Sequence, residues 1–334
     1  MALSRSIILV LLLSASAYSF QPSSTSAWTS RTKSSFARAA ISADVERAKA
    51  YLMGGPRPTA EGAPAATGLT PATIIGGNGR IGDLLASLGG GGDTIIGRED
   101  PIPADGEGPI FVCTRNDVLA SIVAKTPEHR QEDLVFMQNG YLDSFLEEYG
   151  LESNTQALIY FAVSKKGEAP IDGKTDLNPD GLTAVTGKWA AAFKKRIEAA
   201  GLACFDIDTE AYRVAMFEKL IWIDAFMLVG ALNGGITVGE VEKIHRQEVT
   251  ELIGELCSAV TLKTGTKFGP GCSERLCAYA RSVAHFPTAI KEFEWRNGYF
   301  WNISEEAEDE GKPDPCPTHT AYCNKGLVED IFSF

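Results

Sequence analysis

The sequence lacks several features that mark common functional classes. Among its 334 residues no apolar run reaches the roughly 20 residues that span a bilayer. Basic residues are outnumbered by acidic ones, 31 against 43, and the net charge of −12 argues against nucleic acid or an anionic membrane as the main partner. The seven cysteines are scattered and odd in number, which favours free thiols over a disulfide framework. The chain is long enough for two domains, and with 44% hydrophobic residues it can bury a substantial core.

The first 45 residues are predicted to be a targeting leader. Residues 1–17 combine one basic residue, a short apolar run and the small-residue cleavage site Ala15–Ala17, as in a secretory signal peptide. Residues 18–45 are rich in Ser, Thr and Ala and have the composition of a transit peptide. The tandem resembles the bipartite leaders of plastid proteins in algae with secondary plastids, in which an aromatic residue follows the cleavage site, as Tyr18 does here. We expect import into the plastid (chloroplast) through the ER; plain secretion is the alternative.

A glycine-rich turn between a predicted strand and a predicted helix is the central motif. Thr73–Ile75 is β-branched and apolar, as in a buried strand, and Asp83–Leu88 suits a helix. The glycines between them form G-x-G-x-x-G, which permits a tight turn, close approach of a pyrophosphate and close helix packing. The helix N-terminus adds N–H groups for the phosphates. A glycine-rich surface loop is the alternative. The predicted cofactor-binding residues here are Gly77, Asn78, Gly79, Arg80, Ile81 and Gly82.

Predicted strands and helices alternate from residue 73 to residue 207. This pattern is typical of a parallel sheet with helices on both faces, in which ligands bind at the carboxyl ends of the strands. Arg98 follows the second predicted strand, and Gln138-Asn139-Gly140 follows the fourth. An arginine at the end of the second strand accommodates a 2′-phosphate, so Arg98 favours NADP. Because two acidic residues follow Arg98, a solvated loop charge is the alternative.

The remainder of the chain has no strand pattern. Asp208 can cap a long helix over Thr209–Leu232, and Thr237–Glu240 is a capping box that opens the next helix. Further helices are predicted over 273–283 and 289–296. The expected fold class is α/β, a Rossmann-like parallel sheet domain followed by an all-α domain. The expected segments are a signal peptide (1–17), a transit peptide (18–45), a linker (46–72), a Rossmann-like dinucleotide-binding domain (73–207), a helical domain (208–303) and an acidic C-terminal tail of weak order (304–334).

In this order the motifs resemble those of the ketopantoate reductase family, over about residues 73–303. That family has an N-terminal Rossmann domain and a helical C-terminal domain like that of 6-phosphogluconate dehydrogenase. The resemblance implies NADP as the cofactor, with Gln138 and Asn139 in its site, and it leaves a homodimer open. The motifs that carry it are Gly77–Gly82, Arg98, Gln138–Gly140, Glu218–Leu220, and Glu292 ahead of Asn297-Gly298.

The resemblance also implies a reaction. In the family the helix lysine protonates the substrate carbonyl while NADPH delivers hydride, and Lys219 matches that lysine. Glu292 is then expected to hold the substrate or to orient Lys219. Two asparagines that follow the family's lysine are Ile223 and Met227 here, so the polar floor for ketopantoate is absent. We expect an NADP-dependent oxidoreductase that reduces a small 2-keto acid or related carbonyl. The alternative is a non-catalytic plastid protein that retains a dinucleotide-binding fold.

Other side chains with catalytic or metal-binding chemistry are weaker candidates. Arg115 stands where the family has a lysine after the third strand. His285 could be a second proton donor, or it could cap a helix. Cys316, His319 and Cys323 are possible zinc ligands, but they lack a fourth ligand and the usual spacing, so no metal site is predicted.

Overall fold

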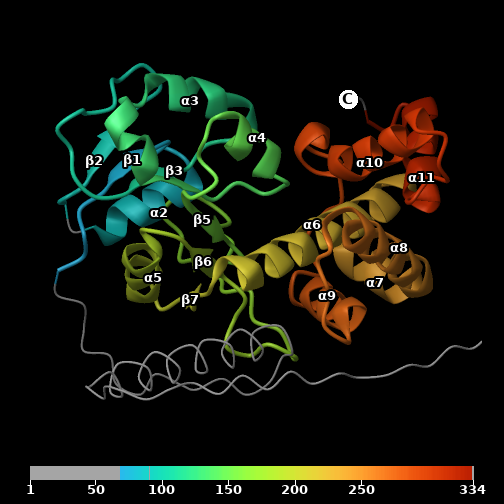
Figure 1. Cartoon of the computed structure of the whole chain (residues 1–334). Helices are drawn as coiled ribbons and strands as arrows, with labels where there is room; N and C mark the ends of the chain where they lie inside the picture. Colours follow the sequence, from blue (N-terminus) through green and yellow to red (C-terminus); the bar gives the residue numbers. More distant parts are fainter. Residues whose placement is uncertain (1–67, 90, 333–334) are drawn as a thin grey trace, which may run out of the picture. The chain divides into compact units, whose positions relative to one another are not determined.

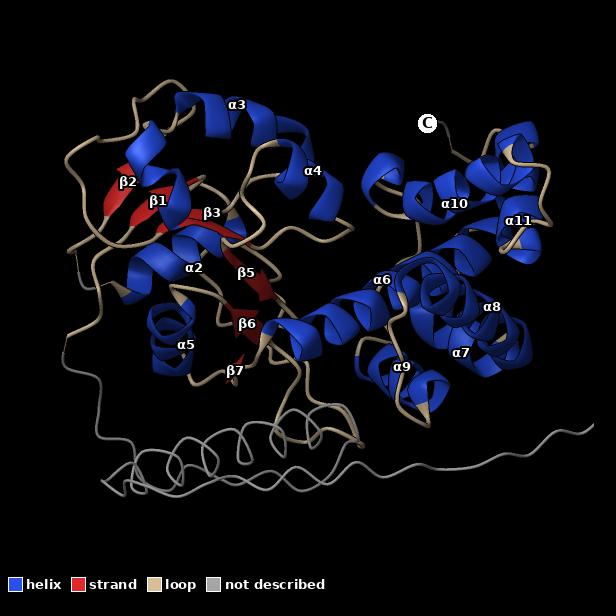
Figure 2. Ribbon diagram, in the orientation of Figure 1, coloured by secondary structure: helices blue, strands red, loops and turns tan. Residues whose placement is uncertain are grey.

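A seven-stranded sheet with its helices occupies the first half of the structure, and a helical region occupies the second (Figures 1 and 2). The structure, a computed structural model, describes residues 68–89 and 91–332. The predicted leader and nearly all of the predicted linker lie outside the described residues. In the part of the chain described, no helix is both long enough and apolar enough to cross a membrane.

The strands are arranged in the order β2-β1-β3-β4-β5-β6-β7. The first five run parallel to their neighbours, β6 is antiparallel to β5, and β7 is parallel to β6. The predicted parallel sheet is therefore confirmed for β1 to β5, and their carboxyl ends share one edge. The strands are β1 (Thr73–Ile75), β2 (Thr94–Ile96), β3 (Ile110–Val112), β4 (Leu134–Phe136), β5 (Thr155–Leu158), β6 (Ala184–Thr186) and β7 (Phe205–Asp206).

Helices cover both faces of the sheet because successive strand residues point to opposite sides. Ile74 and Phe111 point to the face covered by α2 and α5, in one buried cluster with Leu85. Ile75 and Val112, one position further along the same strands, pack on the opposite face with α3 and α4. The near-continuous apolar strands in the sequence are thus explained by burial on two sides. These helices are α2 (Arg80–Leu88), α3 (Leu119–Lys125), α4 (Asp143–Glu148) and α5 (Ala190–Ala199).

The helical region is built around α6 (Thr209–Leu232), which has the bounds predicted from the sequence. The Asp208 carboxylate caps it, since it accepts a hydrogen bond of 2.8 Å from the Ala211 amide. Most side chains of α6 are buried, on the sheet side as well as among the other helices. The helices around it are α7 (Val238–Ile244), α8 (Arg246–Thr264), α9 (Cys272–Ser282), α10 (Asn297–Asp309) and α11 (Pro317–Val328).

Three predictions about this region were wrong. The capping box was predicted to open one helix whose apolar positions continue to Leu256, but that helix ends at Ile244, and α8 begins after His245. The helix predicted over 289–296 is only a short 3-10 turn, Phe293–Trp295, because Glu292 before it takes a left-handed backbone conformation. The weakly ordered tail predicted over 304–334 contains the end of α10 and all of α11. Its acidic residues occupy the exposed face of α10, while Ile303, Ser304 and Ala307 are buried.

Candidate active site at the carboxyl edge of the sheet

The glycine turn after β1 folds back tightly on itself. Gly76 takes a left-handed φ of 82°, and its carbonyl accepts a hydrogen bond of 2.9 Å from the Gly79 amide. A Cβ at Gly82 would lie 2.4 Å from the Gly76 carbonyl oxygen, so α2 approaches the turn as closely as backbone allows. The first glycine of the motif, Gly77, was expected to permit the tight turn. The residue with the left-handed backbone conformation is instead Gly76, directly before it.

The N-terminus of α2 is open toward solvent. Gly79, its N-cap, provides no capping side chain, and Asn78, Gly79 and Arg80 are exposed. The Arg80 guanidinium donates to the Val163 carbonyl (3.1 Å) beyond the end of β5, while Ile81 packs against the buried cluster below the sheet. Uncapped N–H groups and the helix dipole are what a pyrophosphate requires. The residues of this turn therefore fit a dinucleotide.

Arg98 lies just after β2, where the adenosine ribose lies in dinucleotide folds. Its side chain is exposed. Of the acidic residues beside it, Asp100 is engaged by the loop itself, since its carboxylate accepts a hydrogen bond of 2.8 Å from the Gly97 amide. Lys125 of α3 donates to the Arg98 carbonyl at 3.4 Å, which adds a second cation to this end of the crevice.

Gln138 joins the ends of β3 and β4. Its amide nitrogen donates to the carbonyls of Val112 (2.8 Å) and Thr114 (3.2 Å), and its oxygen accepts from the Met137 amide (3.0 Å). The side chain is buried, so it shapes this edge of the sheet through backbone contacts. The Asn139 side chain is exposed, and its carbonyl accepts a hydrogen bond of 3.0 Å from Asn116 after β3.

Gly140 connects this edge to the helical region. Its φ is 117°, and a Cβ would lie 2.3 Å from the Trp295 carbonyl oxygen. The same carbonyl accepts a hydrogen bond of 2.7 Å from the Tyr141 amide. Only glycine allows the chain to pass here, so Gln138–Gly140 and the turn before α10 are held in contact.

Glu292 reaches the carboxyl end of β3 from that turn. Its carboxylate accepts hydrogen bonds from the Asn116 amide (3.3 Å) and from Arg296 (2.5 Å). Glu292 and Asp330 are the only non-glycine residues with positive φ in the described chain, and strain of this kind concentrates at functional sites. Arg296 and Asn116 are not among the site residues predicted from the sequence, although Arg296 stands four residues after Glu292, the spacing of a helical ion pair.

Lys219 reaches the carboxyl end of β5 from α6. Its ammonium donates to the Ile159 carbonyl, just after β5, and lies 4.7 Å from the centre of the Tyr160 ring. Only 6% of the residue is exposed. Burial, with a smaller contribution from the positive charge of Arg296, lowers the pKa of Lys219 to about 7. Lys219 and Glu292 therefore contact the same edge of the sheet that carries the glycine turn.

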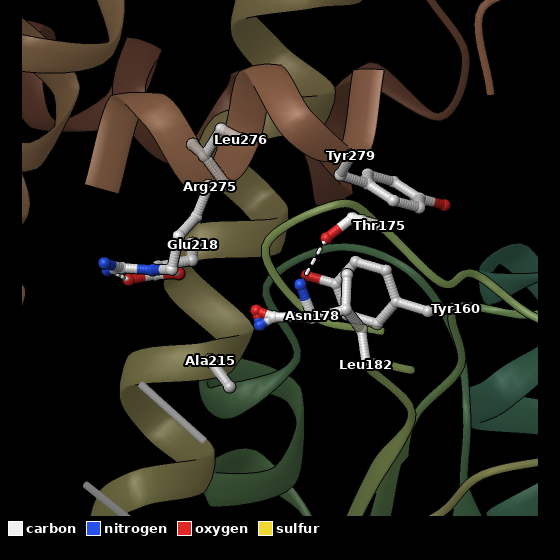
Figure 3. A pocket seen from close by; sticks show the side chains of 9 residues that line it. All are labelled: Tyr160, Thr175, Asn178, Leu182, Ala215, Glu218, Arg275, Leu276 and Tyr279. Atoms are coloured by element: carbon white, nitrogen blue, oxygen red, sulfur yellow. Dashed lines mark hydrogen bonds and ion pairs between the residues drawn. The ribbon is translucent and has the colours of Figure 1, made fainter. Parts of the chain in front are cut away.

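A pocket lined by polar and apolar side chains lies beside Tyr160 (Figure 3). Glu218 and Arg275 form a buried ion pair in its wall, and the Asn178 amide points toward α6. The Asn178 amide nitrogen is buried without a hydrogen-bond partner in the structure. Tyr160 both lines this pocket and lies against the Lys219 amine.

Several weaker candidates are not brought to the site. Arg115 is exposed and pairs with Asp117, and His285 is exposed in the turn after α9. Ile223 belongs to the hydrophobic core around α6, and the partly buried Met227 packs against that core. In residues 68–89 and 91–332, no group of three or more His, Cys, Asp or Glu side chains could hold a metal ion. The possible zinc ligands are instead buried around α11: Cys316, His319 and Cys323.

Comparison with known proteins identifies the fold. No protein-family model and no curated protein matches the sequence. A PanE/ApbA family ketopantoate reductase from Ralstonia eutropha JMP134 superposes with a TM-score of 0.56 at 16% identity, over 78% of this chain and 99% of that chain. A dimeric ketopantoate reductase from Staphylococcus aureus gives 0.51 at 17%, over 77% and 98%. D-mandelate dehydrogenase with NADH and anilino(oxo)acetate gives 0.51 at 13%, over 76% and 97%.

The chain thus has the ketopantoate reductase-like fold, a Rossmann-like sheet followed by a helical domain, as predicted. D-mandelate dehydrogenase has the same arrangement. At these identities the likeness establishes the fold, and the chemistry has to be argued from the residues of this chain.

Proposed function

We propose that this chain is an NADP-dependent reductase of a small 2-keto acid with an apolar side chain. The observation that carries the proposal is the buried amine of Lys219, with a pKa lowered to about 7, at the sheet edge that carries the glycine turn. A general acid is most effective when its pKa is near the working pH. Perturbed groups of this kind concentrate at functional sites.

In a carbonyl reduction, different residues of the site would bind the cofactor, donate the proton and position the side chains. The glycine turn and the uncapped N-terminus of α2 would hold the pyrophosphate, and the bound cofactor supplies the hydride. Lys219 donates a proton to the carbonyl oxygen as the hydride reaches the carbonyl carbon, which gives a 2-hydroxy acid. Glu292 holds Arg296 against the end of β3, and the buried surroundings of Lys219 keep water from its amine.

The apolar floor supports a substrate other than ketopantoate. Ile223 and Met227 offer no hydrogen bond to a substrate hydroxyl, and both pack in the core around α6. A hydroxyl bound against such a surface would lose its hydrogen bonds to water without replacement. D-mandelate dehydrogenase, which shares the fold, was solved with anilino(oxo)acetate, a carboxylate next to a carbonyl that carries an aromatic group. We infer a 2-keto acid of comparable polarity.

Arg98 and the neighbouring Lys125 support NADP over NAD. Both are positively charged, and they stand at the end of β2, where a 2′-phosphate would lie. Asp100 competes little with that phosphate for Arg98, because its carboxylate already accepts a hydrogen bond from the Gly97 amide.

A non-catalytic nucleotide-binding protein is the second candidate, and a specific observation favours it. The positions of the family's two substrate asparagines have become part of the hydrophobic core. In such a remnant the glycine turn would still bind a dinucleotide, but Lys219 would have no substrate to protonate.

Cofactor binding and turnover test the proposal together. We expect NADPH, titrated into the full-length protein, to quench its intrinsic fluorescence. NADPH oxidation should then be followed with a panel of 2-keto acids that runs from ketopantoate to apolar and aromatic side chains. Turnover of an apolar member would support the reductase. Binding without any turnover would favour the remnant, and absence of NADPH or NADH binding at millimolar concentration would overturn both.

We further propose that residues 1–45 direct the protein to the plastid and that it forms a homodimer, as the Staphylococcus aureus neighbour does. A reporter fused to these residues should enter the plastid, and Tyr18→Ala should stall it before the stroma. Export of the unmodified fusion would decide for secretion. Light scattering of the purified protein would give its oligomeric state.

A further inference from the structure

We propose that Arg296 binds the carboxylate of the substrate, next to the carbonyl that faces Lys219. The inference rests on the proposed function, and it names a specificity-determining residue for which neither the glycine motif nor the matched lysine gives any indication. It also explains how the chain can hold a keto acid although α6 presents Ile223 and Met227 in place of amides.

The Arg296 side chain is held in place by an ion pair, but one of its hydrogen-bond donors has no acceptor. Glu292 accepts a hydrogen bond of 2.5 Å from its Nη2 atom. Its Nε atom is buried and has no hydrogen-bond partner in the structure, and only 14% of the side chain is exposed. A buried N–H without an acceptor is unfavourable, and a ligand that supplies the acceptor removes that cost. The guanidinium is therefore prepared for a planar, two-oxygen acceptor such as a carboxylate.

The charges around Arg296 leave room for an anion. Glu292 holds Arg296 at the end of β3, and Lys219 stands at the end of β5, so two cationic side chains lie at the same edge of the sheet. The positive charge of Arg296 also contributes to the lowered pKa of Lys219. Glu292 neutralises one of them. Asp224, on the next turn of α6, does not pair with the other, because both of its carboxylate oxygens are buried without a hydrogen-bond partner in the structure. Complete burial also raises its pKa well above the usual range, which disfavours the charged form. A bound carboxylate would complete the charge balance.

The geometry matches the two functional groups of a 2-keto acid. In such a substrate the carboxylate and the carbonyl are bonded to each other, so one ligand at this sheet edge can offer an acceptor both to Arg296 beyond β3 and to Lys219 beyond β5. One N–H of the Lys219 amine donates to the Ile159 backbone carbonyl, and the other N–H groups remain for the carbonyl oxygen of the substrate.

Binding of a non-reacting acid tests the inference without turnover. The full-length protein would be titrated calorimetrically with anilino(oxo)acetate and with its neutral amide, each with and without NADPH. We expect Arg296→Gln to weaken binding of the acid about 10-fold to 100-fold, the usual effect of losing a charge-assisted hydrogen bond, and to leave the amide unchanged. Arg246→Gln is the matched control, because Arg246 also pairs with a glutamate four residues away.

A second readout separates ligand contact from a structural role. Because a carboxylate beside Lys219 favours its charged form, the wild-type protein should take up a proton when it binds the acid at pH 8, and none when it binds the amide. Calorimetry in two buffers of different ionisation enthalpy measures this uptake. Arg296→Gln should lower the affinity for the acid while thermal unfolding stays cooperative. If Arg296→Gln does not fold, Arg296→Lys, which keeps the charge but not the fork, should show the same selective loss to a smaller degree.

Three results would overturn the inference. These are equal loss of affinity for the acid and the amide, wild-type protein that binds the amide as tightly as the acid, and wild-type protein that binds neither. Failure of the proposed function looks different. In that case the acid still binds in an Arg296-dependent way, but NADPH is not bound or no 2-keto acid is reduced.

Discussion

The glycine turn after β1 and the buried face of α6 both lie at the carboxyl edge of the sheet. They depart from the family pattern to different degrees. The turn keeps every glycine of the motif: a Cβ at Gly79 or Gly82 would crowd the Gly76 carbonyl oxygen, and a Cβ at Gly77 would crowd the Ile95 side chain. On α6 the lysine is present, but the two positions that follow on its face are apolar. The difference follows from how each region would bind. A pyrophosphate is held by backbone N–H groups, which any sequence that keeps the turn provides. A substrate is held by side chains, which can change one at a time.

Lys219→Ala tests this comparison with the largest expected effect. If α6 retains its chemistry, turnover of the best 2-keto acid should fall about 10²–10⁴-fold, the usual contribution of a positioned acid. NADPH affinity should not change, because Lys219 contacts the end of β5 and not the glycine turn. Steady-state kinetics and fluorescence titration measure the two separately. Turnover that survives the substitution would show that α6 has lost its role.

Gly82→Ala probes the other region. The new Cβ would lie 2.4 Å from the Gly76 carbonyl oxygen, so the turn must open. We expect cofactor affinity to fall by about 1–3 kcal/mol, the range for overpacking a tight site. Gly254→Ala in α8 is the matched control, because its Cβ would meet nothing within 4 Å. That control should leave binding unchanged and slightly stabilise the helix. Equal binding by both variants would contradict the assignment of the turn.

Arg98→Ala sharpens the comparison within the cofactor site. A charge-assisted contact to a 2′-phosphate contributes about 1.5–3 kcal/mol, so NADPH should bind about tenfold to a hundredfold more weakly while NADH changes little. Arg281→Ala serves as a control, since Arg281 of α9 pairs with Asp176 and Glu242. If NADH and NADPH lost affinity equally, Arg98 would have no role in choosing the cofactor.

The pH profile gives the smallest effect. Lys219 must be charged to donate a proton, and its pKa is lowered to about 7. The value of kcat/KM should therefore be flat at lower pH and fall about tenfold per pH unit above 7. Stability should change in the opposite sense. Between about pH 7 and the ordinary lysine value the unfolded chain binds the extra proton, so the unfolding free energy rises with pH there, and Lys219→Met should abolish this rise. A profile without a break near 7 would assign the proton to another group.

Much of the fold could be predicted because its signals are local. β1, α2 and α6 follow from apolar strands, glycine spacing and the Asp208 cap, all within short stretches of sequence. The elements that were missed depend on distant partners. β6 has only three residues and is defined by its pairing with β5. Helix α11 is held in place by the burial of Cys316, His319 and Cys323. The acidic residues that precede it in the sequence gave no indication of this packing.

The candidate site could be predicted only where a motif fixes a backbone shape. Lys219 was found by its resemblance to a family lysine, but its burial against Ile159 and Tyr160 required the structure. Arg296 lies in an ordinary stretch of sequence, and its unpartnered Nε atom appears only once the chain is folded. Gln138 was predicted to contact the cofactor, and that stays a prediction; its hydrogen bonds to the ends of β3 and β4 could be seen only in the folded chain.

The hydrogen bond between Asn116 and Glu292 joins residues 176 positions apart in the chain. The glycine turn, by contrast, is closed by residues within six positions of one another. Loop closure over long separations is slow and comes late in folding, whereas local turns form early. During synthesis the glycine turn can close while the segment before α10 is still in the ribosome. A refolding protein should accordingly recover NADPH binding before it recovers turnover, because the carboxylate that holds Arg296 in place arrives last.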